Sequence, residues 1–247
     1  AATPDPLALA PQDRAWVDAR LAEMTVEQKI GQLFVLSSKN DDLAEIDEHC
    51  VLGVGGIHRF PGHDLAQAWE ATRAAYERSA IPPLISGDIE GGSLSHNYAS
   101  AVPNQMALAA AGDLDLSRQV ARGVARESRA MGFNWTFSPV VDINANFRNA
   151  VVGTRSYGAD VDTIIAQGLV LVEELQAHGI AATAKHWPGD GIDDRDQHLV
   201  TTVNTLDRSS WDNSFGRIYR AMIAGGVMAV MSAHLALPAY IRARDPA

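Results

Sequence analysis

The chain contains almost no cysteine, few aromatic residues and no long apolar run. Its 247 residues include one cysteine, Cys50, and only 6% aromatic residues. A single cysteine excludes an intrachain disulfide and any zinc site built on several cysteines. No uninterrupted apolar run reaches the roughly 20 residues that a membrane-spanning helix needs. What remains is an ordinary globular composition, 47% hydrophobic and 20% charged, enough for one large α/β domain or two small ones.

Positive charge is also in short supply. Lysine and arginine number 20 against 30 acidic residues, a formal net charge of −10. This balance argues against a nucleic-acid or anionic-membrane partner, because both need a basic face. The sequence begins Ala-Ala-Thr-Pro-Asp-Pro without a methionine. Such a start fits either a mature end left by signal cleavage or a trimmed product, and of the two compartments we favour export over the cytoplasm.

Apolar, strand-like runs alternate with amphipathic, helix-like segments. We expect strands at residues 32–36, 54–60, 83–88, 137–142, 180–186 and 227–234. We expect helices at residues 13–24, 113–130, 160–178 and 209–224. A further helix should start at the capping box 25–28, and another should follow the second strand and end at about residue 78. This alternation predicts a parallel sheet with right-handed crossovers. A (β/α) barrel is the expected architecture. A doubly wound open sheet is the alternative, but no strand is followed by the G-x-G-x-x-G pattern of dinucleotide binding.

Five of the six expected strands have a polar residue at or next to their end. These residues are Arg59, Asp88, Asp142, Lys185 with His186, and His234. The carboxyl ends of parallel barrel strands meet on one face, where enzymes of this architecture place their active sites. The pattern therefore predicts a polar site on that face.

The most informative stretch is residues 185–198, KHWPGDGIDDRDQH, which follows the buried strand expected at 180–186. Asp196 stands two residues before His198, and a carboxylate that accepts from one imidazole nitrogen orients the ring for proton transfer. The same region also supplies metal-ligand types: His186, Asp193, Asp194, Asp196, His198 and His234. A metal-dependent barrel hydrolase is therefore a second hypothesis, although the H-x-H pair after the first strand of many such enzymes is absent.

Seven sequence blocks occur in an order that we know from one family. They are residues 24–32 (MTVEQKIGQ), 53–56 (GVGG), 88–92 (DIEGG), 137–142 (FSPVVD), 155–158 (RSYG), 185–198 and 230–234 (VMSAH). Together they resemble the catalytic domain of glycoside hydrolase family 3, and within it the bacterial β-N-acetylhexosaminidase (NagZ-like) branch. Several departures fall in residues 185–198. Asp190 stands where that branch has histidine, Ile192-Asp193 stand where it has Asp-Thr, and Gln197 stands where it has serine.

The resemblance implies a retaining hydrolysis through a covalent glycosyl-enzyme, without a metal or organic cofactor. It assigns the acid/base role to His198, oriented by Asp196. It implies that Asp88, Arg155, Lys185 and His186 bind the sugar. The expected substrate is a terminal β-linked N-acetylhexosamine, such as N-acetylglucosamine, from cell-wall or chitin-type oligosaccharides.

The chain is shorter than the resemblance requires. We expect a TIM-type (β/α)8 barrel with about six β/α units, forming one domain over residues 1–247 that lacks the C-terminal units. The family's nucleophilic aspartate lies on a seventh strand, so no residue here is assigned to it, and a second chain or segment is expected to complete the barrel. Alternatives are a β-glucosidase-type member of the family and a non-catalytic fragment without its nucleophile.

Several other residues allow a structural interpretation. We expect Glu90 to anchor backbone amides, and Asp142 to orient Lys185 or Arg155. We expect Trp187 to be the one tryptophan able to stack on a sugar. His234 is interpreted either as a core imidazole or as part of the site. The remaining histidines without supporting context, expected to be solvated or locally bonded, are His58, His63, His96 and His178.

Overall fold

The computed structural model describes residues 8–60, 62, 64–91 and 99–241, which form an α/β fold with parallel strands. The first part of the chain contains α1 (Pro11–Glu23), α2 (Val26–Gly31), β1 (Val35–Lys39), α3 (Leu43–Leu52), β2 (Gly56–Phe60), α4 (Leu65–Arg78) and β3 (Leu84–Gly87). The middle contains α5 (Gln105–Ala111), α6 (Leu114–Ala130), β4 (Trp135–Thr136), η2 (Gly153–Arg155) and α7 (Val161–Ala177). The last part contains β5 (Thr183–Trp187), β6 (Thr202–Val203), α8 (Arg208–Asn213), α9 (Phe215–Ala224), β7 (Ala229–Ser232), β8 (Leu235–Ala236) and α10 (Pro238–Ile241). None of the helices in the described ranges is long and apolar enough to span a membrane.

The strands form one curved parallel strip. The first sheet has the order β1-β2-β3-β4, and β5 pairs in parallel with β7. Two isolated parallel bridges, Trp135 with Ala181 and Val140 with Lys185, connect these two sheets. A separate short parallel pair is formed by β6, which follows β5 in the chain, and β8, which follows β7. The predicted parallel α/β architecture is therefore confirmed, and the strip carries the strand order of a (β/α) barrel.

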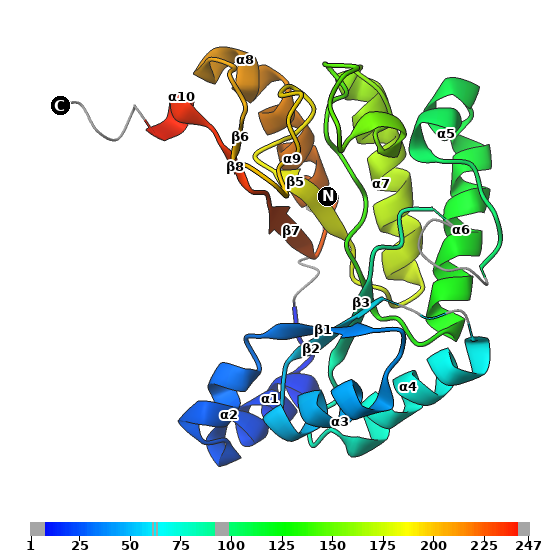
Figure 1. Ribbon diagram of the computed structural model, residues 1–247, viewed down its shortest axis with the longest axis vertical. Coiled ribbons are helices and arrows are strands. Elements are labelled where there is room, and N and C mark those ends of the chain that lie inside the picture. The colour runs from blue at the N-terminus through cyan, green and yellow to red at the C-terminus, as the bar shows by residue number, and fades with distance from the viewer. Residues whose placement is uncertain (1–7, 61, 63, 92–98, 242–247) are drawn as a thin grey trace.

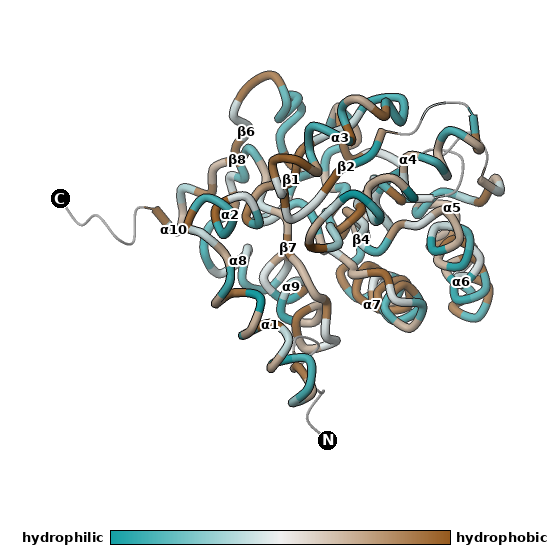
Figure 2. Tube along the Cα trace, turned by 90° about the horizontal axis from the view of Figure 1, so that it is seen from below, coloured by the Kyte–Doolittle hydropathy of each residue, from teal (hydrophilic) through white to brown (hydrophobic). Residues whose placement is uncertain are grey.

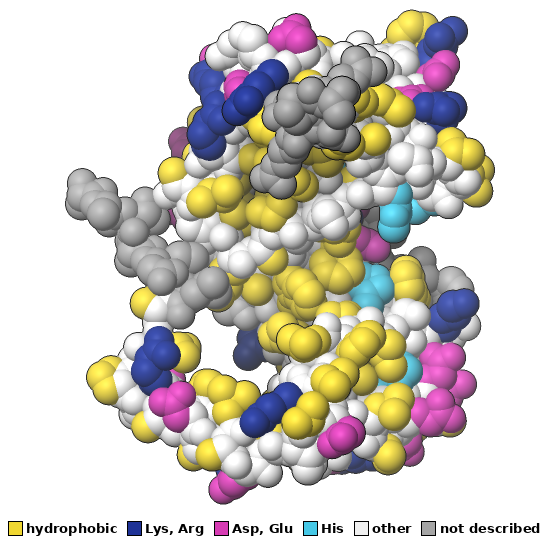
Figure 3. Space-filling model, turned by 90° about the vertical axis from the view of Figure 1, so that its left-hand side faces the viewer, with side chains coloured by type: hydrophobic (Ala, Val, Ile, Leu, Met, Phe, Trp, Pro, Cys, Tyr) yellow, Lys and Arg dark blue, Asp and Glu magenta, His cyan; other side chains and the backbone are white. Residues whose placement is uncertain are grey.

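The predicted barrel is not closed. Within the described ranges, β1 pairs only with β2 and β7 pairs only with β5, so the two outer strands keep one edge each without a partner strand. Figure 1 shows β1 and β7 facing each other across the open side, with the helices outside the strip. On this side the space-filling view shows hydrophobic side chains gathered along the middle of the molecule (Figure 3). Exposed apolar residues at or beside these two strands include Leu33, Phe34, Val35, Met228 and Val230.

Two hydrophobic cores hold the helices against the strip. One joins β2 and β3 with α3 and α4, and includes Ile57, Ile85 and Phe133. The other joins β5 with α7 and α9, and includes Leu175 and Ile218. Figure 2 shows α7 as largely hydrophobic and α6 as more hydrophilic. α7 is buried between neighbours on several sides, whereas α6 presents only one face to the core.

Helix starts follow the local sequence. The predicted capping box is confirmed: the Thr25 hydroxyl accepts from the Gln28 backbone N–H, and the Gln28 side chain accepts from the Thr25 N–H. Aspartates cap several other helices by accepting hydrogen bonds from the first turn, namely Asp42, Asp64, Asp113, Asp160 and Asp207.

Several boundaries differ from the sequence prediction, and three of the differences are larger than a shift of an element's ends or have a local cause. The first strand begins at Val35 rather than at residue 32, because α2 continues into a turn in which the Gln32 N–H donates to the Gln28 carbonyl. The strand predicted at 137–142 is reduced to β4 and one bridge at Val140, and Pro139 has no N–H to extend a ladder. The helix predicted at 209–224 divides into α8 and α9 at Ser214.

Arg59 does not point to the active face as predicted. It is 1% exposed, and its guanidinium donates to Asp41 Oδ1 from Nε at 2.8 Å and from Nη2 at 2.6 Å. It also donates to the Thr72 hydroxyl and lies over the Phe133 ring. The Arg59 side chain therefore points into the core at the end of β2. A buried cation is tolerated there only because it is paired and hydrogen-bonded.

Removing Asp41 should destabilise the fold strongly. Asp41→Ala leaves the buried guanidinium of Arg59 without its anion, and such losses cost about 3–5 kcal/mol. Urea unfolding followed by circular dichroism measures the change. Asp47→Ala is the control because Asp47 forms an exposed pair with Arg78, which should be worth less than about 1 kcal/mol. Equal losses in the two variants would contradict this interpretation of the Asp41–Arg59 pair.

Candidate active site

The Lys185 ammonium lies at the centre of a polar cluster at the carboxyl ends of β3 and β5. Its Nζ is 2.8 Å from Asp88 Oδ1 and 2.7 Å from Glu90 Oε1, and its side chain is only 3% exposed. Asp88 and Glu90 follow β3 directly, whereas Lys185 lies within β5. The predicted convergence of Asp88 and Lys185 is therefore observed.

Arg155 joins the cluster through Glu90. Its Nε and Nη2 donate to the two Glu90 carboxylate oxygens at 2.6 and 2.5 Å, a bidentate pair. Glu90 was expected to anchor backbone amides, but its carboxylate is ion-paired with Arg155 and Lys185. One signal could have identified it: Glu90 is two residues after Asp88, and in extended chain such residues share a side.

The surroundings keep both carboxylates ionised. Burial alone would raise the pKa of Asp88, but the nearby His58 imidazole and the Lys185 ammonium outweigh it and hold that pKa well below its usual range. Burial also acts to raise the pKa of Glu90, and the Arg155 hydrogen bond with the Lys185 charge lowers it overall. The Asp88 side chain is 45% exposed and that of Glu90 is 8% exposed. Asp88 is thus the carboxylate that can accept hydrogen bonds from a ligand, and Glu90 supports the cations.

His58 belongs to this cluster, contrary to the prediction of a solvated or locally bonded side chain. Its Nδ1 is 3.1 Å from Ser86 Oγ, and its Nε2 is 3.6 Å from Asp88 Oδ2. The ring stacks on Phe137 with centroids 4.7 Å apart. The sequence missed it because only the register of β2 against β3, with His58 opposite Ser86, brings the imidazole beside Asp88.

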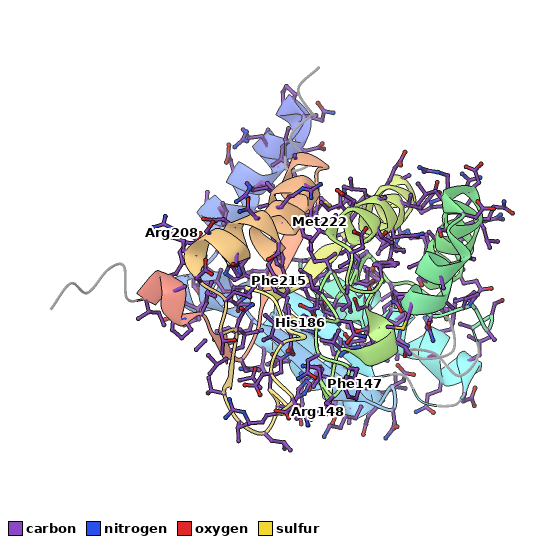
Figure 4. The ribbon with its side chains drawn as sticks, turned by 90° about the horizontal axis from the view of Figure 1, so that it is seen from above. Phe147, Arg148, His186, Arg208, Phe215 and Met222 are labelled. Carbon is purple, nitrogen blue, oxygen red and sulfur yellow. The ribbon has the colours of Figure 1, made fainter. Side chains whose placement is uncertain are left out.

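His186, the residue after Lys185 in β5, is held by Asp142. The fully buried Asp142 is 2.6 Å from His186 Nδ1 and accepts from the His186 backbone N–H at 3.1 Å. Asp142 was expected to orient Lys185 or Arg155, but its hydrogen bonds go to His186 and to the Asp190 N–H. With a proton on Nδ1, His186 Nε2 is the nitrogen that can meet a ligand. Figure 4 shows His186 near the middle of the view from above.

The predicted contact between Asp196 and His198 is present. His198 Nδ1 is 2.7 Å from Asp196 Oδ1, which also accepts from the His198 backbone N–H at 2.8 Å. These two hydrogen bonds, from the backbone first, lower the pKa of Asp196. The His198 ring is 64% exposed, so it stands on the outer part of the loop rather than inside the cluster. Its role as acid/base remains a prediction.

Two glycines fix the turn that leads from β5 into this loop. Gly189 has a φ of +120°, and a Cβ there would lie 2.0 Å from the Phe215 ring. Gly191 has a φ of +104°, and a Cβ there would lie 1.9 Å from the Ile143 carbonyl oxygen. Only glycine fits these positions. Phe215 comes from α9 and is labelled in the view from above (Figure 4).

The remaining predicted residues lie as follows. Trp187 is 39% exposed and packs edge-to-face on Trp211 and Tyr219, so part of its surface is available for stacking. His234 is an exposed loop residue rather than a core imidazole. His178 is locally bonded to the Glu174 carbonyl, as predicted. His63 and His96 lie outside the described residues.

The residues suggested for a metal site do not gather. Among the described residues, no group of three or more histidine, cysteine or acidic side chains has an arrangement that could hold a metal ion. Asp193 instead receives two nitrogens of Arg195, and Asp194 lies 3.2 Å from Arg148.

The fold and cluster define a class: a parallel (β/α)-barrel-like domain with ionised side chains at the carboxyl ends of its strands, suited to binding a polar ligand. Comparison with known families then identifies it. The sequence profile of the "Glycosyl hydrolase family 3 N terminal domain" matches residues 25–246, and the chain belongs to this family.

Individual relatives agree with this assignment. The chain is 46% identical to a "Beta-N-acetylglucosaminidase/beta-glucosidase" of Cellulomonas fimi over 99% of its own length and 43% of that protein. Its structure resembles "Beta-glucoside phosphorylase BglX bound to 2FGlc" with a TM-score of 0.92 at 30% identity, covering 99% of this chain and 44% of that one. A family 3 β-N-acetylglucosaminidase from Paenibacillus sp. str. FPU-7 gives a TM-score of 0.83 at 35% identity, covering 87% and 43%. The chain therefore spans less than half the length of these three proteins.

The lowered pKa of Glu90 predicts a component of acid sensitivity. An unfolded glutamate takes up a proton near pH 4.5, while folded Glu90 does so only at lower pH. This part of the stability is present above about pH 4.5 and is lost as the pH falls toward the folded pKa, with a slope of up to about 1.4 kcal/mol per pH unit. Glu90→Gln should have a correspondingly smaller slope in urea unfolding measured from about pH 6 to about pH 3. The same substitution at exposed Glu48 is the control, and identical slopes for wild type and Glu90→Gln would refute the prediction.

Proposed function

We propose that this chain is the barrel part of a retaining glycosidase that releases a terminal β-linked N-acetylhexosamine, such as N-acetylglucosamine, from cell-wall or chitin-type oligosaccharides. The observation that carries the proposal is the cluster of Asp88, Lys185, Glu90 and Arg155 at the strand ends. The printed names of the Cellulomonas fimi and Paenibacillus relatives support the choice of sugar. Since one of those names also includes β-glucosidase, glucosides are the alternative substrate.

The sugar would be held by complementary hydrogen bonds. Asp88 accepts from sugar hydroxyls, and Lys185, Arg155 and His186 Nε2 approach its other oxygens. Glu90 holds the two cations in place, and Asp142 holds His186. Few side-chain rotamers therefore remain to be fixed when the sugar binds. Such contacts replace the water that a buried polyol loses.

In the proposed reaction, a carboxylate oxygen attacks the anomeric carbon as the glycosidic C–O bond breaks. His198 gives its proton to the departing oxygen, and then takes a proton from the water that releases the sugar. Asp196 keeps the imidazole oriented for both steps. We assign no nucleophile within residues 1–247, and we propose that a further segment or chain completes the barrel and supplies it. The single-domain organisation of residues 1–247 remains a prediction.

Loss of the His198 imidazole should reduce turnover more than binding. His198→Ala in the full-length protein should lower kcat for N-acetylglucosaminides by roughly 10²–10⁴, with a small change in KM. The loss should be greater for a disaccharide than for a nitrophenyl glycoside, because nitrophenolate departs with little proton transfer. A panel of nitrophenyl N-acetylglucosaminide, glucoside and xyloside tests the sugar at the same time.

His178→Ala is the matched control, since His178 is bonded locally at the end of α7. Full activity of His198→Ala would remove the acid/base assignment. Hydrolysis of the glucoside without the N-acetylglucosaminide would remove the substrate assignment.

A second candidate is phosphorolysis, favoured by the phosphorylase title of the similar structure with a TM-score of 0.92. In this reaction a phosphate oxygen, rather than water, attacks the anomeric carbon of the glycosyl-enzyme, and the phosphate proton passes to His198. A neutral imidazole does not repel the phosphate dianion as a carboxylate base would.

Inorganic phosphate distinguishes the two reactions. Under our first proposal, wild-type protein with and without about 10 mM phosphate should release free sugar at the same rate, because water is the acceptor. Phosphorus-31 NMR detects any sugar 1-phosphate. Sugar 1-phosphate as the main product would replace hydrolysis by phosphorolysis as the function.

A further inference from the structure

Two of the positions at which residues 185–198 depart from the family pattern, Asp190 and Gln197, contact each other. Gln197 Nε2 donates to Asp190 Oδ2 at 2.8 Å. Both residues are almost completely buried, Asp190 at 3% exposed and Gln197 at 4%. Although Gln197 lies between Asp196 and His198, its side chain points inward while the His198 ring is exposed.

The orientation of the Gln197 amide is fixed from its other end. The His234 backbone N–H donates to Gln197 Oε1 at 3.1 Å, so the amide nitrogen must face Asp190. Asp190 must therefore present an accepting oxygen to Gln197. Its other oxygen accepts from the Asn149 side chain at 3.0 Å and from the Gly191 N–H at 2.6 Å.

Asp190 also connects this loop to the floor of the site. Its backbone N–H donates at 2.8 Å to Asp142, the carboxylate that holds His186. Burial raises the pKa of Asp190, and the nearby Asp142 charge adds to this effect. Hydrogen bonds from the Gly191 N–H and the Asn149 side chain act in the opposite direction. A buried carboxylate of this kind requires its hydrogen-bond donors to stay in place.

We propose that Asp190 and Gln197 are positioning residues. The hydrogen bond between their side chains keeps the loop that carries Asp196 and His198 at a fixed position relative to the polar cluster at the strand ends. This inference rests on the proposed function, because it assigns a purpose to the loop that carries His198. We call this contact the Asp190–Gln197 bridge. Neither residue touches the reacting atoms; they act by placing His198.

The bridge can be broken by either single substitution and rebuilt by the two together, with the charge of the pair unchanged in the double variant. In Asp190→Asn, either an amide nitrogen faces the Gln197 nitrogen, or the flipped amide faces the donors of Asn149 and Gly191. In Gln197→Glu, two carboxylates face each other. In the double variant the new amide nitrogen at position 190 can donate to the new carboxylate at position 197, whose second oxygen still accepts from the His234 N–H. The double variant therefore restores every pairing with the roles exchanged.

A double-variant cycle in the full-length protein tests the proposal. Each single variant should lower kcat about tenfold with little change in KM, which corresponds to one unsatisfied buried group. The double variant should return to within about threefold of wild type. Gln119→Glu, at an exposed position of α6, is the control and should match wild type.

Hydrogen exchange supplies a readout that does not depend on activity. The backbone N–H groups of residues 198–200 donate to Asp196, so their exchange should be faster in each single variant and return in the double. If a single variant does not fold, the double must still fold and work. A double variant as impaired as the worse single, or single variants equal to wild type in both readouts, overturns the proposal. Full activity of His198→Ala would instead defeat the acid/base assignment while leaving the exchange result to decide whether the bridge holds the loop.

Discussion

The arrangement of the site depends on one buried ammonium shared by two carboxylates. Lys185 on β5 lies within 2.8 Å of both Asp88 and Glu90, which follow β3. A lysine with 3% of its side chain exposed is stable in its charged form only when such partners surround it. The pair Asp88 and Lys185, 97 residues apart, therefore fixes two strand ends relative to each other. Arg155 joins the cluster through its bidentate ion pair with Glu90, whose side chain is only 8% exposed.

The contacts divide the site into a rigid floor and an outer loop. The floor contains the buried supporting groups Glu90 and Asp142, which hold Arg155, Lys185 and His186 in place. The outer loop carries the Asp196–His198 pair with an exposed ring. Gly189 and Gly191 set the turn between them, and the Asp190–Gln197 bridge crosses it. A reaction that needs a fixed sugar and a mobile proton carrier would use such a division.

Local sequence predicted much of the fold and half of the site, for identifiable physical reasons. The alternation of apolar runs and amphipathic segments fixes a parallel α/β fold, and Asp88 and Lys185 were found because strand ends of this fold converge. The contact of Asp196 with His198 spans two residues and is encoded locally. Arg59, His58 and Glu90 were misinterpreted, because which way each points depends on strand register and on partners far along the chain: Asp41, Asp88 and Arg155. An incomplete barrel was expected from the number of strand-like runs, and the described strands leave the edges of β1 and β7 open.

The central claim is that the Asp88–Lys185–Glu90–Arg155 cluster binds a sugar. Calorimetric titration of the full-length protein with N-acetylglucosamine, for wild type and for Asp88→Ala, tests it most directly. Asp88 is the half-exposed acceptor of the cluster, and loss of a charged hydrogen-bonding group in a binding site costs about 1.5–3 kcal/mol, or roughly tenfold to hundredfold in Kd. Binding by wild type that weakens by this amount in Asp88→Ala is the predicted result. Equal affinity in the two proteins, or no binding by wild type, would contradict the account.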